Sequence, residues 1–454
     1  MSQKAKDILL KITVNICRLV LASTFIFSGF VKANDPYGTA YKMTDYLNVW
    51  NIHLPEMFTL LGAVILATIE LVIGLYLLFG ISKRPIARIT TVFMGVMTLF
   101  TIYIAIANPV TDCGCFGDAI ILTNTETLLK NIILMGASIM LWRNYDKQIK
   151  FLSKNTEWLI SIFSNIYAVF LAGYSITHLP VFDFRPYHIG ADIRKSVEIP
   201  EDQRPEFENI IVYERNGEKL ELGLDDDDPD STWIYVETKR IMTKEGGKSL
   251  ISDFYIIDKE GEDIAQLILE EEGYNFLLIA PMLENANQGY IGDINAIYDY
   301  AKENGYGFYC ITASDTTAQK YWTEHTGAEY EYFMGDERAL KTIVRSNPGL
   351  VLLKDGKIIT KRSTYDLPDD HILSDRLENI DFGKSDIVTF KRKIAYILLT
   401  FILPLLLLTV IDRLAAGWSF YRNIKRRSKD FQLENIERVL GLEKAEEKDT
   451  NNNN

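Results

Sequence analysis

The chain has few of the side chains that build disulfide frameworks and metal centres. Its 454 residues include only four cysteines and five histidines, too few and too scattered for the cysteine-stapled fold of a small secreted domain. No His-Glu-x-x-His motif is present, which argues against a zinc-hydrolase site. Lysine and arginine number 48 against 61 aspartates and glutamates. The resulting net charge of −13 argues against nucleic acid or an anionic lipid surface as the main partner.

Long apolar runs, by contrast, are abundant. A helix needs roughly 20 apolar residues to cross the hydrocarbon core of a bilayer. Six runs approach this length: residues 12–31, 57–80, 86–107, 126–142, 159–179 and 394–411. Lys130 interrupts the fourth run, although a lysine near a helix end can extend its ammonium group to the membrane interface. The sequence therefore predicts a polytopic α-helical membrane protein with about six spans, in contact with the lipid bilayer.

Basic residues occur in every second connection between these runs. They are Lys4, Lys6, Lys11, Lys83, Arg84, Arg88, Arg143, Lys147, Lys150, Lys154, Arg422, Lys425, Arg426, Arg427 and Lys429. Residues 108–125 contain no lysine or arginine. By the positive-inside rule, we expect both termini in the cytoplasm, with residues 108–125 and a domain at 181–392 on the outer, periplasmic side of the cytoplasmic (inner) membrane. A cleaved signal peptide fits the first run poorly because Arg18 interrupts it.

Strand and helix patterns alternate in the later part of this external domain. "YNFLLIAP" and "GFYCITAS" are typical of buried strands, the stretch between them predicts a helix that ends at Gly305, and "LKDGKI" predicts a hairpin turn. This order resembles the thioredoxin fold of the peroxiredoxin and thiol-disulfide reductase type over residues 252–377. Pro348, which follows Asn347, matches the cis-proline of that family, which faces its active site.

The catalytic cysteines of that family are missing from the expected place. The stretch after the first strand reads "PMLENANQGY", where the family has a Cys-x-x-Cys at a helix N-terminus. Cys310 lies in an apolar strand, where free cysteine is usually a buried small side chain. The sequence predicts a degenerate thioredoxin-like α/β domain that docks a protein partner without exchanging thiols.

The remaining segments complete the division of the chain. An acidic run at 225–228 lacks the ligand spacing of an EF-hand loop and is interpreted as a solvated turn. We predict a four-helix membrane domain at 1–150, a fifth span within 151–182, a β-rich connecting region at 183–251, the thioredoxin-like domain at 252–390, a sixth span within 391–413 and a cytoplasmic tail at 414–454.

Charged residues inside the first runs carry a second resemblance. Arg18 and Lys32 stand at either end of the first run, Glu70 lies well inside the second, and "DCGCFGD" lies between the third and fourth. Together these features make residues 8–145 similar to the DoxX and MauE group of redox-associated membrane proteins. The resemblance implies a four-helix unit linked to thiol or quinone chemistry outside, with MauE associated with disulfide formation in a partner. Because intramembrane charges are usually paired or functional, we expect Arg18 and Glu70 to form a charge pair or, alternatively, a proton relay.

Cys113 and Cys115 are the candidate catalytic residues. The glycine between them supplies the backbone freedom to bring the sulfurs together, and a strained, exposed disulfide is typically labile. Asp112 and Asp118 flank the pair without nearby basic residues, so we expect raised thiol pKa values and a pair that accepts electrons as a disulfide. The alternatives are a permanent structural disulfide, two free thiols and a metal site. No metal is predicted, because thiolates one residue apart lack the usual zinc spacing.

Two functions are compatible with these residues. In the first, the protein is a membrane-embedded redox protein whose cysteine pair exchanges electrons with a periplasmic thiol partner or a quinone. In the second, it is a non-catalytic membrane adaptor or assembly factor, and the cysteines only stiffen a loop. The topology and cysteine spacing favour the first, whereas the missing Cys-x-x-Cys and the acidic surroundings favour the second.

Overall fold

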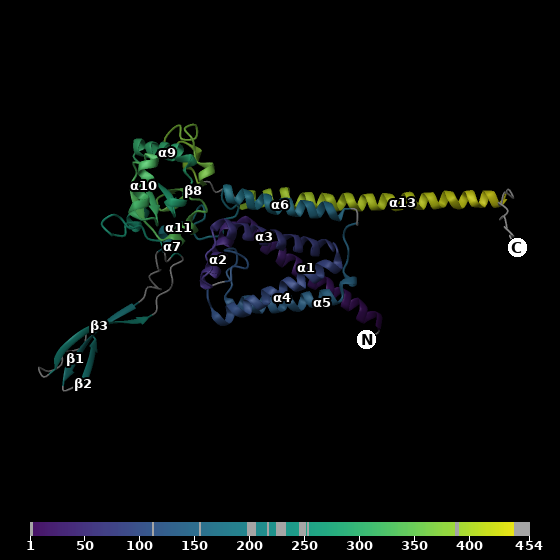
Figure 1. Cartoon of the computed structure of the whole chain (residues 1–454), viewed down its shortest axis with the longest axis horizontal. Helices are drawn as coiled ribbons and strands as arrows, with labels where there is room; N and C mark the ends of the chain where they lie inside the picture. Colours follow the sequence, from purple (N-terminus) through teal and green to yellow (C-terminus); the bar gives the residue numbers. More distant parts are fainter. Residues whose placement is uncertain are drawn as a thin grey trace, which may run out of the picture. The chain divides into compact units, whose positions relative to one another are not determined.

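The computed structural model describes residues 3–110, 113–153, 156–197, 206–215, 218–223, 233–244, 251, 254–385 and 390–439. The acidic run at 225–228 lies outside these residues. The chain divides into two compact units (Figure 1), one formed by Met1–Ala172 and Lys391–Asn454 and the other by Gly173–Phe390. We call them the membrane unit and the α/β unit.

The membrane unit is built from helices. In chain order they are α1 (Gln3–Asn34), α2 (Pro36–Val49), α3 (Glu56–Phe79), α4 (Lys83–Ala107), α5 (Asn124–Arg143), the short η1 (Tyr145–Lys147), α6 (Glu157–Thr177), and α12 (Phe390–Ile397), which continues through η7 (Leu398–Ile402) into α13 (Leu403–Val439). Capping residues in the sequence determine where several of these helices begin. The Asp35 side chain accepts a hydrogen bond from the Gly38 amide at the start of α2, and Thr123 and Glu126 form a capping box at the start of α5.

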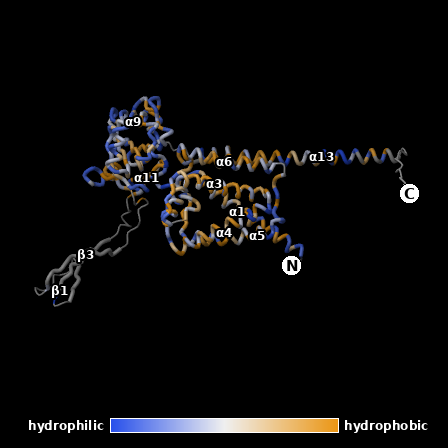
Figure 2. The backbone as a smooth tube through the Cα atoms, in the orientation of Figure 1, coloured by the Kyte–Doolittle hydropathy of each residue, from blue (hydrophilic) through white to orange (hydrophobic). Residues whose placement is uncertain are grey.

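Five helices in the described part of the chain are long and apolar enough to cross a membrane. They span Gln3–Asn34, Glu56–Phe79, Lys83–Ala107, Glu157–Thr177 and Lys391–Leu433. The predicted fourth span is also a helix, α5, but it is not among the five because Glu126, Lys130 and Asn131 lower its hydropathy. Apolar residues lie along the helices of this unit (Figure 2), and many of them are exposed, as expected for contact with lipid.

Helices α1 and α3 approach each other closely at two glycines. A Cβ atom at Gly29 would lie 2.5 Å from the Leu71 amide nitrogen, and one at Gly74 would lie 2.6 Å from the Ile26 amide nitrogen. Small residues allow helix backbones in a membrane to touch in this way. The close approach brings the polar residues of α1 within reach of Glu70 on α3.

The α/β unit contains a five-stranded mixed sheet. Its strands are β4 (Tyr274–Ala280), β5 (Gly307–Thr312), β6 (Tyr332–Met334), β7 (Gly349–Lys354) and β8 (Lys357–Ser363), in the order β6-β5-β4-β7-β8. Strands β4, β5 and β6 are parallel, and β7 is antiparallel to both β4 and β8. The helices of this unit are α7 (Ile193–Val197), α8 (Ala265–Glu270), α9 (Ile291–Asn304), α10 (Thr316–Thr326) and α11 (Glu337–Ile343), with short turns η3 (Leu283–Asn285), η4 (Gln288–Tyr290), η5 (Thr364–Asp366) and η6 (Asp381–Gly383).

The strands, helix and hairpin predicted from the sequence are present in this unit. Strand β4 is buried along its whole length, and α9 ends at Gly305 in a left-handed conformation. Asp355 and Gly356, the central residues of the hairpin turn, both have positive φ, as a two-residue turn that matches the twist of the strands requires.

A separate antiparallel sheet lies within the predicted connecting region. It consists of β1 (Glu206–Arg215), β2 (Glu218–Gly223) and β3 (Ile234–Lys244), in the order β2-β1-β3.

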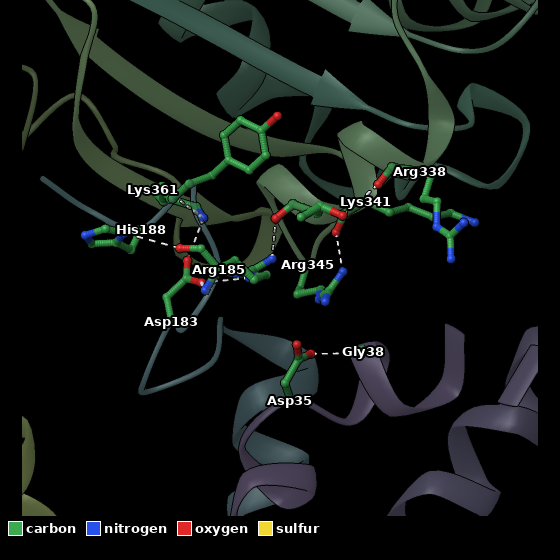
Figure 3. Close-up of polar contacts among 11 residues, drawn as sticks. Asp35, Gly38, Asp183, Arg185, His188, Arg338, Lys341, Arg345 and Lys361 are labelled. Carbon is green, nitrogen blue, oxygen red and sulfur yellow. Dashed lines mark hydrogen bonds and ion pairs between the residues drawn. The ribbon is translucent and has the colours of Figure 1, made fainter. Parts of the chain in front are cut away.

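A buried ion cluster ties the segment after α6 to strand β8 (Figure 3). The Asp183 carboxylate accepts hydrogen bonds at 2.7 Å from both the Arg185 guanidinium and the Lys361 ammonium, and Lys361 also donates to the Tyr187 carbonyl at 3.0 Å. Burial raises the pKa of Asp183, but the two cations outweigh burial and hold that pKa well below its usual range. The cluster is therefore a structural element of the α/β unit, since every charge in it has a partner.

Candidate functional site

Cys113 and Cys115 lie in the connection between α4 and α5, residues 108–123, which we call the cysteine loop. The Asn124 amide holds its two ends together by donating to Asn108 Oδ1 at 2.7 Å and to the Val110 carbonyl at 2.8 Å. Gly114 has a φ of +65°, a conformation that suits glycine, and it turns the chain so that the two sulfurs lie 2.8 Å apart. Both are free thiols and both are half-buried. The loop thus holds a dithiol in contact.

A buried polar network lies directly beneath the loop. The Lys32 ammonium donates to Glu70 Oε2 at 2.8 Å, to Ser28 Oγ at 2.6 Å and to the Cys115 carbonyl at 2.7 Å. Ser28 Oγ also lies 2.7 Å from Glu70 Oε2 and 2.8 Å from the Cys115 carbonyl. Lys32 and Glu70 are each about one-twentieth exposed. Residues from α1 and α3 therefore fix the backbone of Cys115.

This network corrects the expected pairing of Arg18 with Glu70. Glu70 pairs with Lys32, and Ser28, which also contacts Glu70, lies ten residues after Arg18 on the same helix, a rise of about 15 Å. Arg18 instead donates to the Ile149 carbonyl and lies over the Phe151 ring, 5.2 Å from its centroid. Its observed contacts hold the segment after α5 against α1. The same geometry leaves no direct contact for a proton relay between Arg18 and Glu70.

The electrostatic surroundings of the pair also differ from the sequence prediction. A hydrogen bond from the Cys113 thiol lowers the pKa of Cys115 to about 6, with help from Lys130 and Lys32 and against the opposing effect of burial. The same hydrogen bond raises the pKa of Cys113, the donor. The prediction counted only neighbours in sequence, and Asp112 lies outside the described residues. The hydrogen bond from Cys113 is the largest cause of the lowered Cys115 pKa, and the two lysines that add to it come from α1 and α5, so one sulfur of the pair is suited to attack as a thiolate.

A half-open cavity adjoins Cys115. It has about 380 Å³ of empty space, including its mouth. The lining combines apolar and aromatic side chains with a few polar ones: Thr24, Phe25, Ser28, Glu70, Phe93, Met94, Met97, Cys115, Phe116, Lys130, Asn131 and Leu134. Among the described residues, no group of three or more histidine, cysteine, aspartate or glutamate side chains is placed to hold a metal ion.

The second predicted site, around Asn347 and Pro348, is not an exposed surface. The bond between these residues is cis, and Pro348 is buried. The Asn347 side chain donates to the Met282 carbonyl at 2.7 Å, and the Asn347 carbonyl accepts from the Asn287 amide at 2.9 Å. The segment that replaces the expected Cys-x-x-Cys thus contacts this position, and the cis-proline surface implied by the thioredoxin resemblance is covered at Pro348.

Cys310 is the remaining cysteine of the α/β unit. It is fully buried in strand β5, and burial raises the pKa of its thiol. A buried, protonated thiol is a poor nucleophile, so Cys310 is not suited to thiol exchange.

Sequence reasoning identified the two cysteines and Glu70 as site residues but missed the residues that surround them. Ser28 gives no signal in the sequence. Lys32 and Lys130 are recognisable as charges in apolar runs, but nothing in the sequence brings them to Cys115.

Comparison with known proteins relates the membrane unit to a described family. The sequence profile of the family described as "Methylamine utilisation protein MauE" matches residues 10–143, which run from within α1 to the end of α5 and include the cysteine loop. No curated protein and no solved structure matches the chain. The match supports a membrane protein over this part of the chain and the MauE half of the resemblance carried by the charged residues and the cysteine loop.

Proposed function

We propose that the membrane unit exchanges thiols and disulfides with a protein partner on the outer face of the cytoplasmic membrane, with Cys115 as the attacking sulfur and Cys113 as the resolving sulfur. The observation that carries the proposal is the 2.8 Å contact between the two sulfurs. The outer location of the loop and the cytoplasmic location of both termini rest on the alternation of basic residues along the chain.

The exchange has two steps that balance in atoms and electrons. The Cys115 thiolate attacks one sulfur of a partner disulfide and forms a mixed disulfide, and the released partner thiolate takes up a proton. Cys113 then loses its proton, attacks the Cys115 sulfur and expels the second partner thiolate. Two electrons pass from the cysteine pair to the partner. The reverse sequence oxidises a partner dithiol.

We assign partner docking to the α/β unit. The strand order β6-β5-β4-β7-β8 and the cis Asn347–Pro348 bond support a thioredoxin-like fold. No cysteine follows strand β4 in "PMLENANQGY", and Cys310 is buried, so this unit would bind a partner without reacting with it.

The proposal predicts which single variant traps a partner. Cys113→Ser removes the resolving sulfur, so a mixed disulfide between Cys115 and the partner should accumulate. Cys115→Ser leaves only Cys113, a sulfur whose pKa is raised by burial even without Cys115, and we expect at least about tenfold less adduct. The measurement is acid quenching of intact membranes, alkylation, and non-reducing electrophoresis followed by mass mapping of the adduct.

Cys17→Ser and Cys310→Ser are the controls and should leave the adducts unchanged. Equal trapping by Cys113→Ser and Cys115→Ser would contradict the assignment of the two sulfurs. No adduct in either variant, with full activity retained in both, would support the adaptor function instead.

We propose further that the cavity beside Cys115 admits a membrane-soluble quinone. The lining fits such a ring, since Phe25 and Phe93 supply aromatic faces while Lys130 and Asn131 supply polar groups near Cys115. When bound, a quinone would supply an acceptor for the two electrons and two protons that leave the dithiol.

A cavity-filling variant tests the quinone site. Met97→Trp should abolish oxidation of the pair by a short-chain quinone, measured as loss of alkylatable Cys113 and Cys115, because the indole ring occupies the cavity. The matched control is Val96→Trp, since Val96 is 60% exposed and lies outside the lining. Equal oxidation rates in the two variants would refute the site, whereas partner trapping is expected to survive in both.

A further inference from the structure

Lys130 faces the candidate site, and no acidic residue in the described part of the chain forms an ion pair with it. It projects from α5 into the cavity that Cys115 lines, and its ammonium nitrogen lies 4.2 Å from the centroid of the Phe116 ring. No carboxylate of the described residues lies within ion-pair distance of Lys130, whereas Lys32 is paired with Glu70 at 2.8 Å. Phe116 is itself held by Phe27, with the ring centroids 5.5 Å apart.

Among the described residues that line the cavity, Lys130 is thus a cation without an ion pair while both cysteines are thiols. Lys32 and Glu70 neutralise each other, which leaves the positive charge of Lys130. An ionised group facing the interior of a helical bundle is costly unless a counter-charge is near. A thiolate on Cys115 supplies that charge on the same cavity wall, next to the Phe116 ring that holds the ammonium group.

We propose that Lys130 is the counter-ion of a Cys115 thiolate, and that Phe116 positions it so that Cys115 rather than Cys113 becomes the attacking sulfur. The inference deepens the proposed thiol–disulfide exchange and rests on it for its biological meaning. Lys130 is a positioning residue, since it acts on the sulfur through the electric field and forms no bond in the reaction.

The same arrangement favours the reduced state of the pair. Oxidation by glutathione disulfide converts one thiol and one thiolate to the Cys113–Cys115 disulfide and passes two electrons to glutathione, which takes up the proton of the thiol and one proton from solvent and leaves as two thiols. The Lys130 charge then loses its counter-charge. Stabilisation of the thiolate thus makes the pair a stronger oxidant, and removal of Lys130 should make the disulfide easier to form.

Alkylation of the purified full-length protein as a function of pH tests the proposal. In the unchanged chain, mass mapping should show Cys115 reacting with a midpoint near pH 6. Lys130→Met should raise this midpoint by at least one pH unit and slow alkylation at pH 6 by at least about fivefold. The same variant should also shift the equilibrium between the cysteine pair and glutathione toward the Cys113–Cys115 disulfide. Lys130→Arg keeps the positive charge, so it should restore both the pH midpoint of Cys115 alkylation and the glutathione equilibrium.

Two further variants keep the result interpretable. Lys11→Met removes an exposed lysine at the other end of the bundle and should change neither value. Phe116→Leu keeps the lysine but removes the ring that holds it, so the midpoint should rise by less than in Lys130→Met. A midpoint in folded Lys130→Met equal to that of the unchanged chain would overturn the proposal.

The outcome is separable from that of the proposed function. If Lys130→Met shifts the midpoint while Cys113→Ser traps no partner, the counter-ion is real but the exchange with a protein is not. If Cys113→Ser traps a partner and Lys130→Met leaves the pH midpoint of Cys115 alkylation unchanged, the proposed thiol–disulfide exchange is supported and Lys130 has no part in it.

Discussion

Replacing Lys32 with methionine is expected to lower the free energy of unfolding of the membrane unit by about 3–5 kcal/mol, because it leaves the buried Glu70 carboxylate without its cation. The substitution also removes donors to Ser28 and to the Cys115 carbonyl. The measurement is unfolding of the full-length protein in mixed micelles with increasing sodium dodecyl sulfate, followed by intrinsic tryptophan fluorescence.

The double variant Lys32→Met with Glu70→Leu separates charge from packing. Removing both members of a buried pair is often nearly neutral, so we expect the double variant to recover most of the lost stability. It should still alter the cysteine loop, because the Lys32 donor to the Cys115 carbonyl is gone and Ser28 has lost its contact with Glu70. A double variant as unstable as Lys32→Met alone would show that lost packing, and not an unpaired charge, causes the effect.

Replacing Gly29 with alanine is expected to disrupt both the α1–α3 packing and the candidate site. The new Cβ atom would lie 2.5 Å from the Leu71 amide nitrogen and 2.8 Å from the Ala67 carbonyl oxygen. These are backbone atoms, so no side-chain rotation relieves the overlap and the helices must move apart. Overpacking of a core typically lowers the free energy of unfolding by about 1–3 kcal/mol. We expect the loss measured for Gly29→Ala to lie in the upper part of that range.

The site should respond to the same substitution. Ser28 is adjacent to Gly29, and its hydroxyl bridges Glu70 and the Cys115 carbonyl. Separation of the helices stretches these bonds, so the pH midpoint of Cys115 alkylation should change in Gly29→Ala.

Gly136→Ala is the matched control for the packing effect. Gly136 also lies within a helix, α5, but a Cβ atom there has nothing within 4 Å. Alanine should stabilise this helix by about 0.5–1 kcal/mol, because glycine is the weaker helix former. Similar destabilisation by Gly29→Ala and Gly136→Ala would show that the close approach of α1 and α3 is not what makes Gly29 necessary.

The strands and helices of the α/β unit illustrate what could be predicted from the sequence. The apolar run of β4, the end of α9 at Gly305 and the Asp355–Gly356 turn depend on neighbours within a few residues, and all three are present. The burial of Pro348 and the contact of Asn347 with Met282 could not be predicted in this way, because they depend on a loop some sixty residues earlier in the chain.

The candidate site likewise has one feature that depends on neighbouring residues and one that depends on contacts between helices. The Cys-Gly-Cys spacing, which brings the sulfurs together, is a local property of the loop. The partner of Glu70 is not local, since either Arg18 or Lys32 on α1 could in principle have faced it. The choice depends on how far α1 slides along α3, and the contacts at Gly29 and Gly74 set that position.

The sequence by itself determined the apolar helices, the order of the strands along the chain, and a glycine-linked cysteine pair in a loop free of basic residues, because each depends on periodicity or composition over a short stretch. Only the tertiary structure decided that Glu70 pairs with Lys32, that Arg18 holds the segment after α5, and that lysines from α1 and α5 lie near Cys115. The reason is physical. Electrostatic interactions depend on distance in space, and helix packing brings together charges that lie far apart along the chain.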